Sequence, residues 1–377
     1  MDLFLLTLGG LLGLGALAEL LARSWVRSRS EYFILRSYTT TLMRVDRETL
    51  PQLESEVRIA INGDGERGPD PPKNWSDTYR VLVAGGSAAE CYLLDQETSW
   101  PHVIQDELAA QSGRLGARKV HVGNISRSLV ACEYIELMLR RVLPRYRRRL
   151  DLVILMVGAS DVVAWLEKKT PPAMEEGRLS TDYVFDEHPE GPFGWTRSTL
   201  ALRQVLSRAH KRMTRPVGVR DGAGRTIGRN RAMRARAGDL VDVIPDPAPM
   251  VEYFEKYFRR IVETARETGA RVLVVRQPWL SKEFTEEENG RLWNFGAGRP
   301  YEEEVSEYFS HRVVNLLMGA VDTSAARISE ELGVEHVDLM SVLDADFETF
   351  YDRLHFTPKG AKVVGETVAR RILGESS

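Results

Sequence analysis

Two short segments near opposite ends of the 377-residue chain carry the side chains that nucleophilic catalysis needs. Ser87 follows a β-rich run, 79–84, and two glycines that allow a tight turn from a strand into a helix. Such a turn exposes the hydroxyl at the carboxyl edge of an α/β sheet, where ligands bind. Asp352 and His355 are close in sequence, so the carboxylate can orient the imidazole Nδ1–H while Nε2 accepts the serine proton. The three side chains predict a Ser-His-Asp triad, although each segment alone also fits a purely structural turn.

Three motifs, taken in chain order, resemble those of the SGNH (GDSL-like) hydrolases of the membrane-anchored type. Residues 85–87 read Gly-Gly-Ser, where the founders of the family have Gly-Asp-Ser. Residues 158–161 read Gly-Ala-Ser-Asp, which stands for Gly-x-Asn-Asp, and residues 352–360 match Asp-x-x-His-Phe-x-Pro-x-Gly. The resemblance implies a serine esterase that hydrolyses or transfers acyl groups of carbohydrate or lipid esters.

The resemblance covers residues 79–165 and 271–373 and assigns a role to each member of the triad. Ser87 is the expected nucleophile, His355 the expected general base, and Asp352 the carboxylate that orients His355. No cofactor or metal is implied by this chemistry.

The resemblance also implies an oxyanion hole, and here the sequence departs from the family pattern. We expect the donors to be the N–H of Ser87, a backbone N–H at Asn124 or Gly123, and the hydroxyl of Ser160, which replaces the family asparagine. Loss of one oxyanion donor lowers turnover by roughly 10²–10³. The alternative is therefore a binding or scaffold protein of this fold that is catalytically weak or inactive. Such a protein would act in envelope or polysaccharide assembly.

Two further residues are expected near the same edge of the sheet. Asp161 is expected to cap the turn after the third strand rather than to serve as the triad acid. Trp279 follows the fourth strand, where it either lines the substrate cleft or packs in the interior.

The elements that must position these residues alternate between strands and helices. Five short apolar runs with strand character lie at 79–84, 119–123, 152–157, 271–276 and 334–339. Strands that alternate with helices form parallel sheets through right-handed crossovers. We therefore expect an α/β fold with three α/β/α layers and a five-stranded parallel sheet in flavodoxin-like order.

The N-terminus predicts a membrane helix. Residues 3–22 are apolar except for Glu19, and about 20 apolar residues can span a bilayer. Secretory signals carry positive charge before the apolar stretch, whereas here the arginines follow it. We expect an uncleaved single-pass anchor at 1–23, with a signal peptide or a buried core helix as alternatives. The arginines favour a cytoplasmic catalytic domain, whereas anchored relatives of the family act outside the membrane, so the side stays open.

The remaining chain divides into a juxtamembrane connector, 24–78, and a hydrolase domain, 79–377. Within the connector, 23–44 could continue as an amphipathic helix along the membrane surface. The domain carries a strongly basic insertion at 166–249, which we interpret either as a solvated loop or as a lid or patch for acidic lipid head groups or an anionic substrate.

The composition excludes several other classes of protein. A net charge of −3 gives no case for nucleic acid as a partner. Cys91 and Cys132 are too few for a disulfide framework, and the chain has no CxxC, HExxH or P-loop motif. The expected partners are an ester substrate and, through the N-terminal helix, a membrane. The oligomeric state is not predicted.

Overall fold

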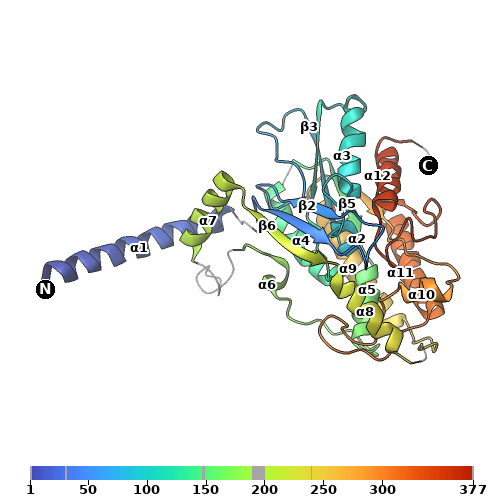
Figure 1. The fold of residues 1–377 in the computed structure, drawn as a ribbon. Coiled ribbons are helices and arrows are strands. Elements are labelled where there is room, and N and C mark those ends of the chain that lie inside the picture. The colour runs from blue at the N-terminus through green and yellow to red at the C-terminus, as the bar shows by residue number, and fades with distance from the viewer. Residues whose placement is uncertain (1, 30–31, 147–148, 189–199, 239, 376–377) are drawn as a thin grey trace.

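The computed structural model describes residues 2–29, 32–146, 149–188, 200–238 and 240–375, and its centre is a parallel sheet (Figure 1). The sheet has five strands in the order β4-β3-β5-β7-β8, and every neighbouring pair is parallel. Its strands are β3 (Thr78–Gly85), β4 (Lys119–Asn124), β5 (Leu152–Met156), β7 (Arg271–Val275) and β8 (Glu335–Val337). This order confirms the predicted α/β fold with a five-stranded flavodoxin-like sheet.

Helices cover both faces of the sheet because the strands are apolar on both sides. Successive side chains of a strand point to opposite faces. In β3, Val81 and Val83 pack against the helices on one face of the sheet. Leu82 and Ala84 pack against the helices on the other face. The first face is covered by α3 (Trp100–Ala110) and α12 (Pro358–Ile372). The second is covered by α4 (Cys132–Val142), α5 (Ala159–Glu167), α9 (Ala248–Arg266) and α11 (His311–Glu331).

The other helices lie at the edges of these layers or leave the body of the molecule. They are α1 (Asp2–Arg29), α2 (Ser87–Glu90), α6 (Thr181–Val184), α7 (Ala201–Thr214), α8 (Arg225–Arg236) and α10 (Glu286–Gly290), with short 3₁₀ turns at Ser112–Leu115 and Leu143–Tyr146.

A second sheet forms where the sequence predicted a connector and an insertion. Its order is β2-β1-β6, with β1 (Thr40–Val45) antiparallel to β2 (Glu56–Ala60) and parallel to β6 (Val217–Ala223). The helix predicted over 23–44 ends at Arg29, so the prediction is wrong beyond that residue. Residues 40–45 form a strand instead, in which the buried Met43 and Val45 lie on either side of the exposed Arg44. The division of the chain into an anchor, a connector and a domain stays a prediction.

Within the described part of the basic insertion, helix α8 is packed against the body of the molecule. Helix α8 lies against the loop that carries the predicted acid and base. Its Arg231 donates to the carbonyl oxygens of Arg291 at 2.8 Å and Tyr351 at 3.3 Å. Arg234 is buried and donates to the carbonyl of Asn289 at 2.8 Å. These arginines hold neighbouring loops in place through backbone acceptors.

Helix α1 projects from the body, and its last turns pack on α7 (Figure 1). Its segment Leu6–Val26 is long and apolar enough to cross a membrane. Glu19, a charged residue inside that segment, is buried and pairs with Arg23. Its carboxylate also accepts the N–H groups of Ala201 and Leu202 at the start of α7, each at 2.8 Å. A carboxylate at a helix N-terminus is a stabilising cap, which explains this charge in an apolar helix.

A buried ionic cluster joins the loop after β2 to the central sheet. Glu66 is fully buried and accepts hydrogen bonds from Tyr146 at 2.6 Å and Asn62 at 2.8 Å. It also lies 3.1 Å from His121 Nε2 and 3.3 Å from Arg80. Burial raises the pKa of Glu66, but these partners outweigh it and hold the pKa well below its usual value.

We predict that Glu66→Ala destabilises the fold by about 3–5 kcal/mol, because the buried Arg80, His121 and Tyr146 lose the carboxylate that they share. Urea unfolding should show this loss, whereas Glu97→Ala, at an exposed carboxylate, should change stability by less than about 0.5 kcal/mol. Since the pKa of Glu66 is lowered on folding, its contribution is present above the ordinary glutamate pKa and is lost as the pH falls through the lowered value. Equal effects of the two substitutions would contradict the role of the cluster.

Candidate active site

The turn after β3 places Ser87 at the carboxyl edge of the sheet, and the two glycines before it lie close to neighbouring atoms. A Cβ on Gly85 would lie 2.2 Å from the carbonyl oxygen of Met156. A Cβ on Gly86 would lie 2.8 Å from the Ser160 hydroxyl oxygen. The chain can therefore pass closely over β5 before α2 begins at Ser87 because position 85 has no side chain, whereas a side chain at position 86 would displace the Ser160 hydroxyl.

The three predicted triad residues lie together and are joined by hydrogen bonds. His355 Nε2 is 2.7 Å from Ser87 Oγ, across 268 positions of sequence. His355 Nδ1 is 2.9 Å from Oδ1 and 2.8 Å from Oδ2 of Asp352. In this arrangement Nδ1–H donates to the carboxylate and Nε2 can accept the serine proton.

Asp352 is held in place by donors on several sides. It is fully buried and accepts the backbone N–H groups of Leu354 at 2.8 Å and His355 at 3.0 Å. The indole N–H of Trp293 donates to its other oxygen at 2.9 Å. Burial raises the pKa of Asp352, but the nearby His355 and the backbone donors outweigh it and leave the pKa below its usual value. The carboxylate is therefore ionised at neutral pH.

Trp293 is a site residue that the sequence did not identify. It lies in the loop after α10, far from every motif, and no local pattern links a lone tryptophan to a distant aspartate. It also lines the cavity beside Ser87.

Asn124, a predicted oxyanion donor, uses both its backbone and its side-chain N–H groups in other hydrogen bonds. Its backbone N–H donates to the carbonyl of Arg67 at 2.9 Å, and its side-chain amide donates to the carbonyl of Ala89 at 2.7 Å. Asn124 is still part of β4, where a short bridge to Arg67 uses its backbone groups. It does not line the cavity that holds Ser87 and His355.

The chain reaches that cavity five residues later, at Leu129. Leu129 has a φ of 63°, a left-handed conformation that costs a leucine about 1–3 kcal/mol. Glu90 holds the preceding turn, since its carboxylate accepts the Ser128 N–H at 2.5 Å. Among the residues that the structure describes, none accepts a hydrogen bond from the Leu129 N–H. A strained residue with an available donor beside Ser87 is a candidate for oxyanion binding.

Ser160 is the other predicted oxyanion donor. It is in the first turn of α5 and lines the same cavity as Ser87 and His355. Its hydroxyl is beside Gly86, the residue before the nucleophile.

The cavity beside Ser87 is small and largely apolar. It has a volume of about 90 Å³. Its apolar wall is formed by Leu129, Ala131, Val163, Ala164, Phe295 and Leu354. Asn294 adds a polar group, because its Oδ1 is buried and has no hydrogen-bond partner among the described residues. Such a cavity fits an acyl group next to an attacking hydroxyl.

The two further residues have structural contacts. Asp161 accepts the Cys132 N–H at 3.1 Å at the start of α4, and burial together with Glu133 raises its pKa to about 7. Trp279 is buried and donates its indole N–H to Asn315 at 3.0 Å, away from the cavity. Within the described ranges, no group of histidine, cysteine and acidic residues could hold a metal ion.

No family model matches the chain, and no curated protein matches its sequence. Solved structures to which the chain is similar include Axe2, an acetylxylan esterase from Geobacillus stearothermophilus, at 12% identity and a TM-score of 0.42 over 79% of this chain and 95% of that chain. A lipolytic protein of the G-D-S-L family from Desulfitobacterium hafniense DCB-2 is 13% identical, with a TM-score of 0.38 over 77% and 98%. A lipase/acylhydrolase from Enterococcus faecalis is 14% identical, with a TM-score of 0.36 over 78% and 96%.

Proposed function

We propose that the chain is a serine ester hydrolase or acyltransferase that works through a Ser87–His355–Asp352 triad. The observation that carries this proposal is the continuous chain of hydrogen bonds from Ser87 Oγ through both imidazole nitrogens to a buried carboxylate. A purely structural turn at Ser87 does not require its hydroxyl to contact a histidine oriented in this way.

The proposed reaction has two halves. Ser87 Oγ attacks the ester carbonyl while its proton passes to His355 Nε2, and Asp352 stabilises the imidazolium that forms. Nε2 then protonates the leaving alcohol, which departs as the acyl group stays on Ser87. Water or an acceptor alcohol enters, gives its proton to Nε2 and takes the acyl group, and the proton returns to Ser87.

The developing oxyanion needs donors on the side opposite His355. We assign this role to the N–H of Ser87, the hydroxyl of Ser160 and, in place of Asn124, the N–H of Leu129. All three residues line one cavity. The left-handed φ of Leu129 supports its part, because strained backbone of this kind is concentrated at functional sites.

The proposed substrate is an ester of a carbohydrate or a lipid, and the small apolar cavity favours a short acyl group. We further propose that α1 anchors the chain as a single-pass membrane helix, with the catalytic domain on the cytoplasmic side. The exposed leucines along α1 support a lipid-facing helix. The second candidate function is a binding or scaffold protein with weak or no catalysis, which the serine at position 160 favours.

We predict that a fluorophosphonate probe labels the wild-type chain at Ser87, because the paired His355 makes this hydroxyl nucleophilic. Ser87→Ala should abolish labelling, whereas Ser76→Ala, at an exposed serine, should label like the wild type. Intact mass and peptide mapping measure the adduct. A folded wild-type sample that takes up no label would favour the scaffold alternative.

We predict that Ser160→Ala lowers kcat by roughly 10²–10³ with little change in KM, because an oxyanion donor acts mainly in the transition state. Steady-state kinetics on an acetylated sugar or p-nitrophenyl acetate measures both constants. An unchanged kcat would remove Ser160 from the oxyanion hole.

We predict that Trp293→Phe lowers kcat/KM by about tenfold to a hundredfold. The substitution removes the indole N–H that donates to the charged carboxylate of Asp352. Trp279→Phe is the matched control, since that indole donates to Asn315 outside the cavity, and it should leave kcat/KM nearly unchanged. Equal losses in both variants would show a general effect on packing instead.

A further inference from the structure

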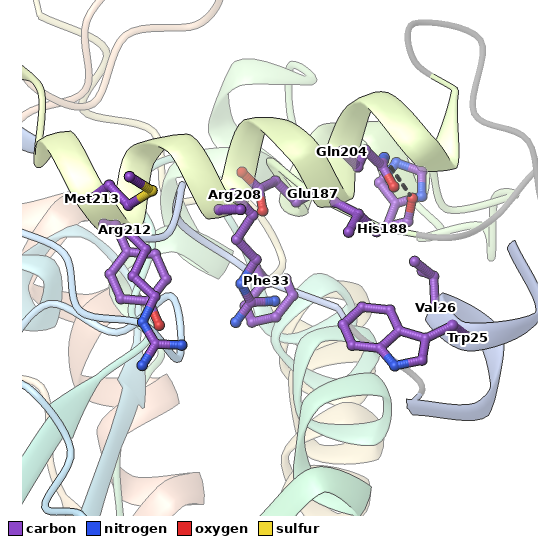
Figure 2. A pocket seen from close by; sticks show the side chains of 12 residues that line it. Trp25, Val26, Phe33, Glu187, His188, Gln204, Arg208, Arg212 and Met213 are labelled. Carbon is purple, nitrogen blue, oxygen red and sulfur yellow. Dashed lines mark hydrogen bonds between the residues drawn. The ribbon is translucent and has the colours of Figure 1, made fainter. Parts of the chain in front are cut away.

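A second cavity lies away from the triad, at the foot of the apolar helix. It has a volume of about 550 Å³ and is bounded by the end of α1, by α7 and by the segment after α1. Figure 2 shows the side chains of Arg208 and Arg212 extending from α7 towards the segment after α1, with Arg208 against the Phe33 ring and with Trp25 and Val26 of α1 at one end. None of the triad residues lines it.

The surface next to this cavity is apolar in the way that a membrane interface requires. Trp25 is 41% exposed at the cavity mouth, and tryptophan is enriched where a helix leaves the bilayer core. On α7, Leu206 is 60% and Met213 is 85% exposed. An amphipathic helix with basic and apolar residues lies along a membrane surface. If α1 spans a bilayer, as proposed above, the cavity opens at the depth of the lipid head groups.

The charges around the cavity favour an anion. The one acidic residue that lines it is Glu187, and Lys211 pairs with this carboxylate at 2.8 Å. Arg208 donates to the carbonyl of Gly63 at 2.6 Å. Arg212 is exposed and lines the cavity, and it forms no ion pair with any residue in the described ranges.

A buried histidine nitrogen that has no hydrogen-bond partner among the described residues is a second, independent indication of a ligand. His188 lines the cavity and is 93% buried, since only 7% of its surface is exposed. Its Nε2 is 2.8 Å from Asp182, but its buried Nδ1 has no hydrogen-bond partner among the described residues. A buried polar atom without a partner is costly unless a ligand or water completes it. Nδ1 can accept from a head-group hydroxyl, or donate to a phosphate oxygen when the ring is protonated.

We propose that this cavity binds the phosphate-bearing head group of an anionic membrane lipid. Arg212 and Arg208 contact the phosphate, His188 contacts the head group beside it, and the acyl chains lie along the exposed apolar surface of α1 and α7. Arginine suits this role because its planar guanidinium matches phosphate oxygens. The site would hold the body of the enzyme at a fixed orientation to the membrane. The inference rests on the proposed anchor and is independent of the proposed triad.

The test uses the full-length chain in nanodiscs of phosphatidylcholine with a minor share of phosphatidylglycerol. Native mass spectrometry counts the lipids that stay bound after release from the disc. The wild type should retain phosphatidylglycerol in preference to phosphatidylcholine, and Arg212→Gln should lower this retention by about tenfold. Arg203→Gln is the matched control, since Arg203 is an exposed arginine of α7 that does not line the cavity, and it should retain the lipid like the wild type.

A second variant, Ala209→Glu, keeps the test decisive if Arg212→Gln folds poorly. Ala209 is exposed and lines the cavity, so a carboxylate there should repel the phosphate and also lower retention. A parallel sample in phosphatidylcholine alone receives inorganic phosphate. Phosphate adducts that depend on Arg212, without retention of phosphatidylglycerol, would assign the site to a soluble phosphate and overturn the lipid assignment.

Three other outcomes also overturn the proposal, and they are distinguishable. Equal retention of both lipids by the wild type would remove the specificity for an anionic head group. Equal losses in Arg212→Gln and Arg203→Gln would show a diffuse attraction of the basic helix to the membrane. A chain that does not enter nanodiscs would remove the anchor as well, whereas triad activity is measured separately with a soluble ester.

Discussion

The 2.7 Å contact between Ser87 Oγ and His355 Nε2 is the interaction on which the functional account depends. It joins segments from the two ends of the catalytic fold, and a parallel sheet makes this possible. The carboxyl ends of parallel strands meet at one edge, so the turn after β3 and the loop before α12 open on the same side. The glycines at 85 and 86 then let the nucleophile approach β5 closely enough to face that loop.

The surroundings of the contact fix its chemistry. Asp352 stays ionised although it is buried, because the imidazole and several donors stabilise its charge. A partner that carries a negative charge next to Nδ1 favours the tautomer in which Nε2 accepts a proton. Helix α8 reinforces the same loop from outside through Arg231. The basic insertion, which reads as a surface feature in the sequence, therefore contributes to the positioning of the acid and base.

The sequence predicted those parts of the molecule that depend on local patterns. The short apolar runs predicted the strands of the central sheet, because a strand covered on both faces needs apolar side chains at every position. The Gly-Gly-Ser turn and the Asp-x-x-His spacing located Ser87, Asp352 and His355, since steric and hydrogen-bonding requirements act within a few residues there.

The parts that the sequence did not predict depend on contacts between distant segments. Strands β1 and β6 are separated by more than 170 positions, and β6 is mostly exposed, so no alternating apolar pattern marks it. The sequence did not show that Asn124 is still part of β4 and uses its backbone in the bridge to Arg67, and leucine at 129 gives no signal of a left-handed turn. Trp293 reaches Asp352 only through the tertiary fold.

The measurement that tests the central claim most directly is a rapid-quench reaction with p-nitrophenyl acetate, followed by peptide mass analysis. The account predicts a burst of about one equivalent of nitrophenol per chain, with the acetyl group on the peptide that contains Ser87. An acetyl group that accumulates on another residue, or folded wild-type protein that releases nitrophenol no faster than Ser87→Ala, would contradict the account.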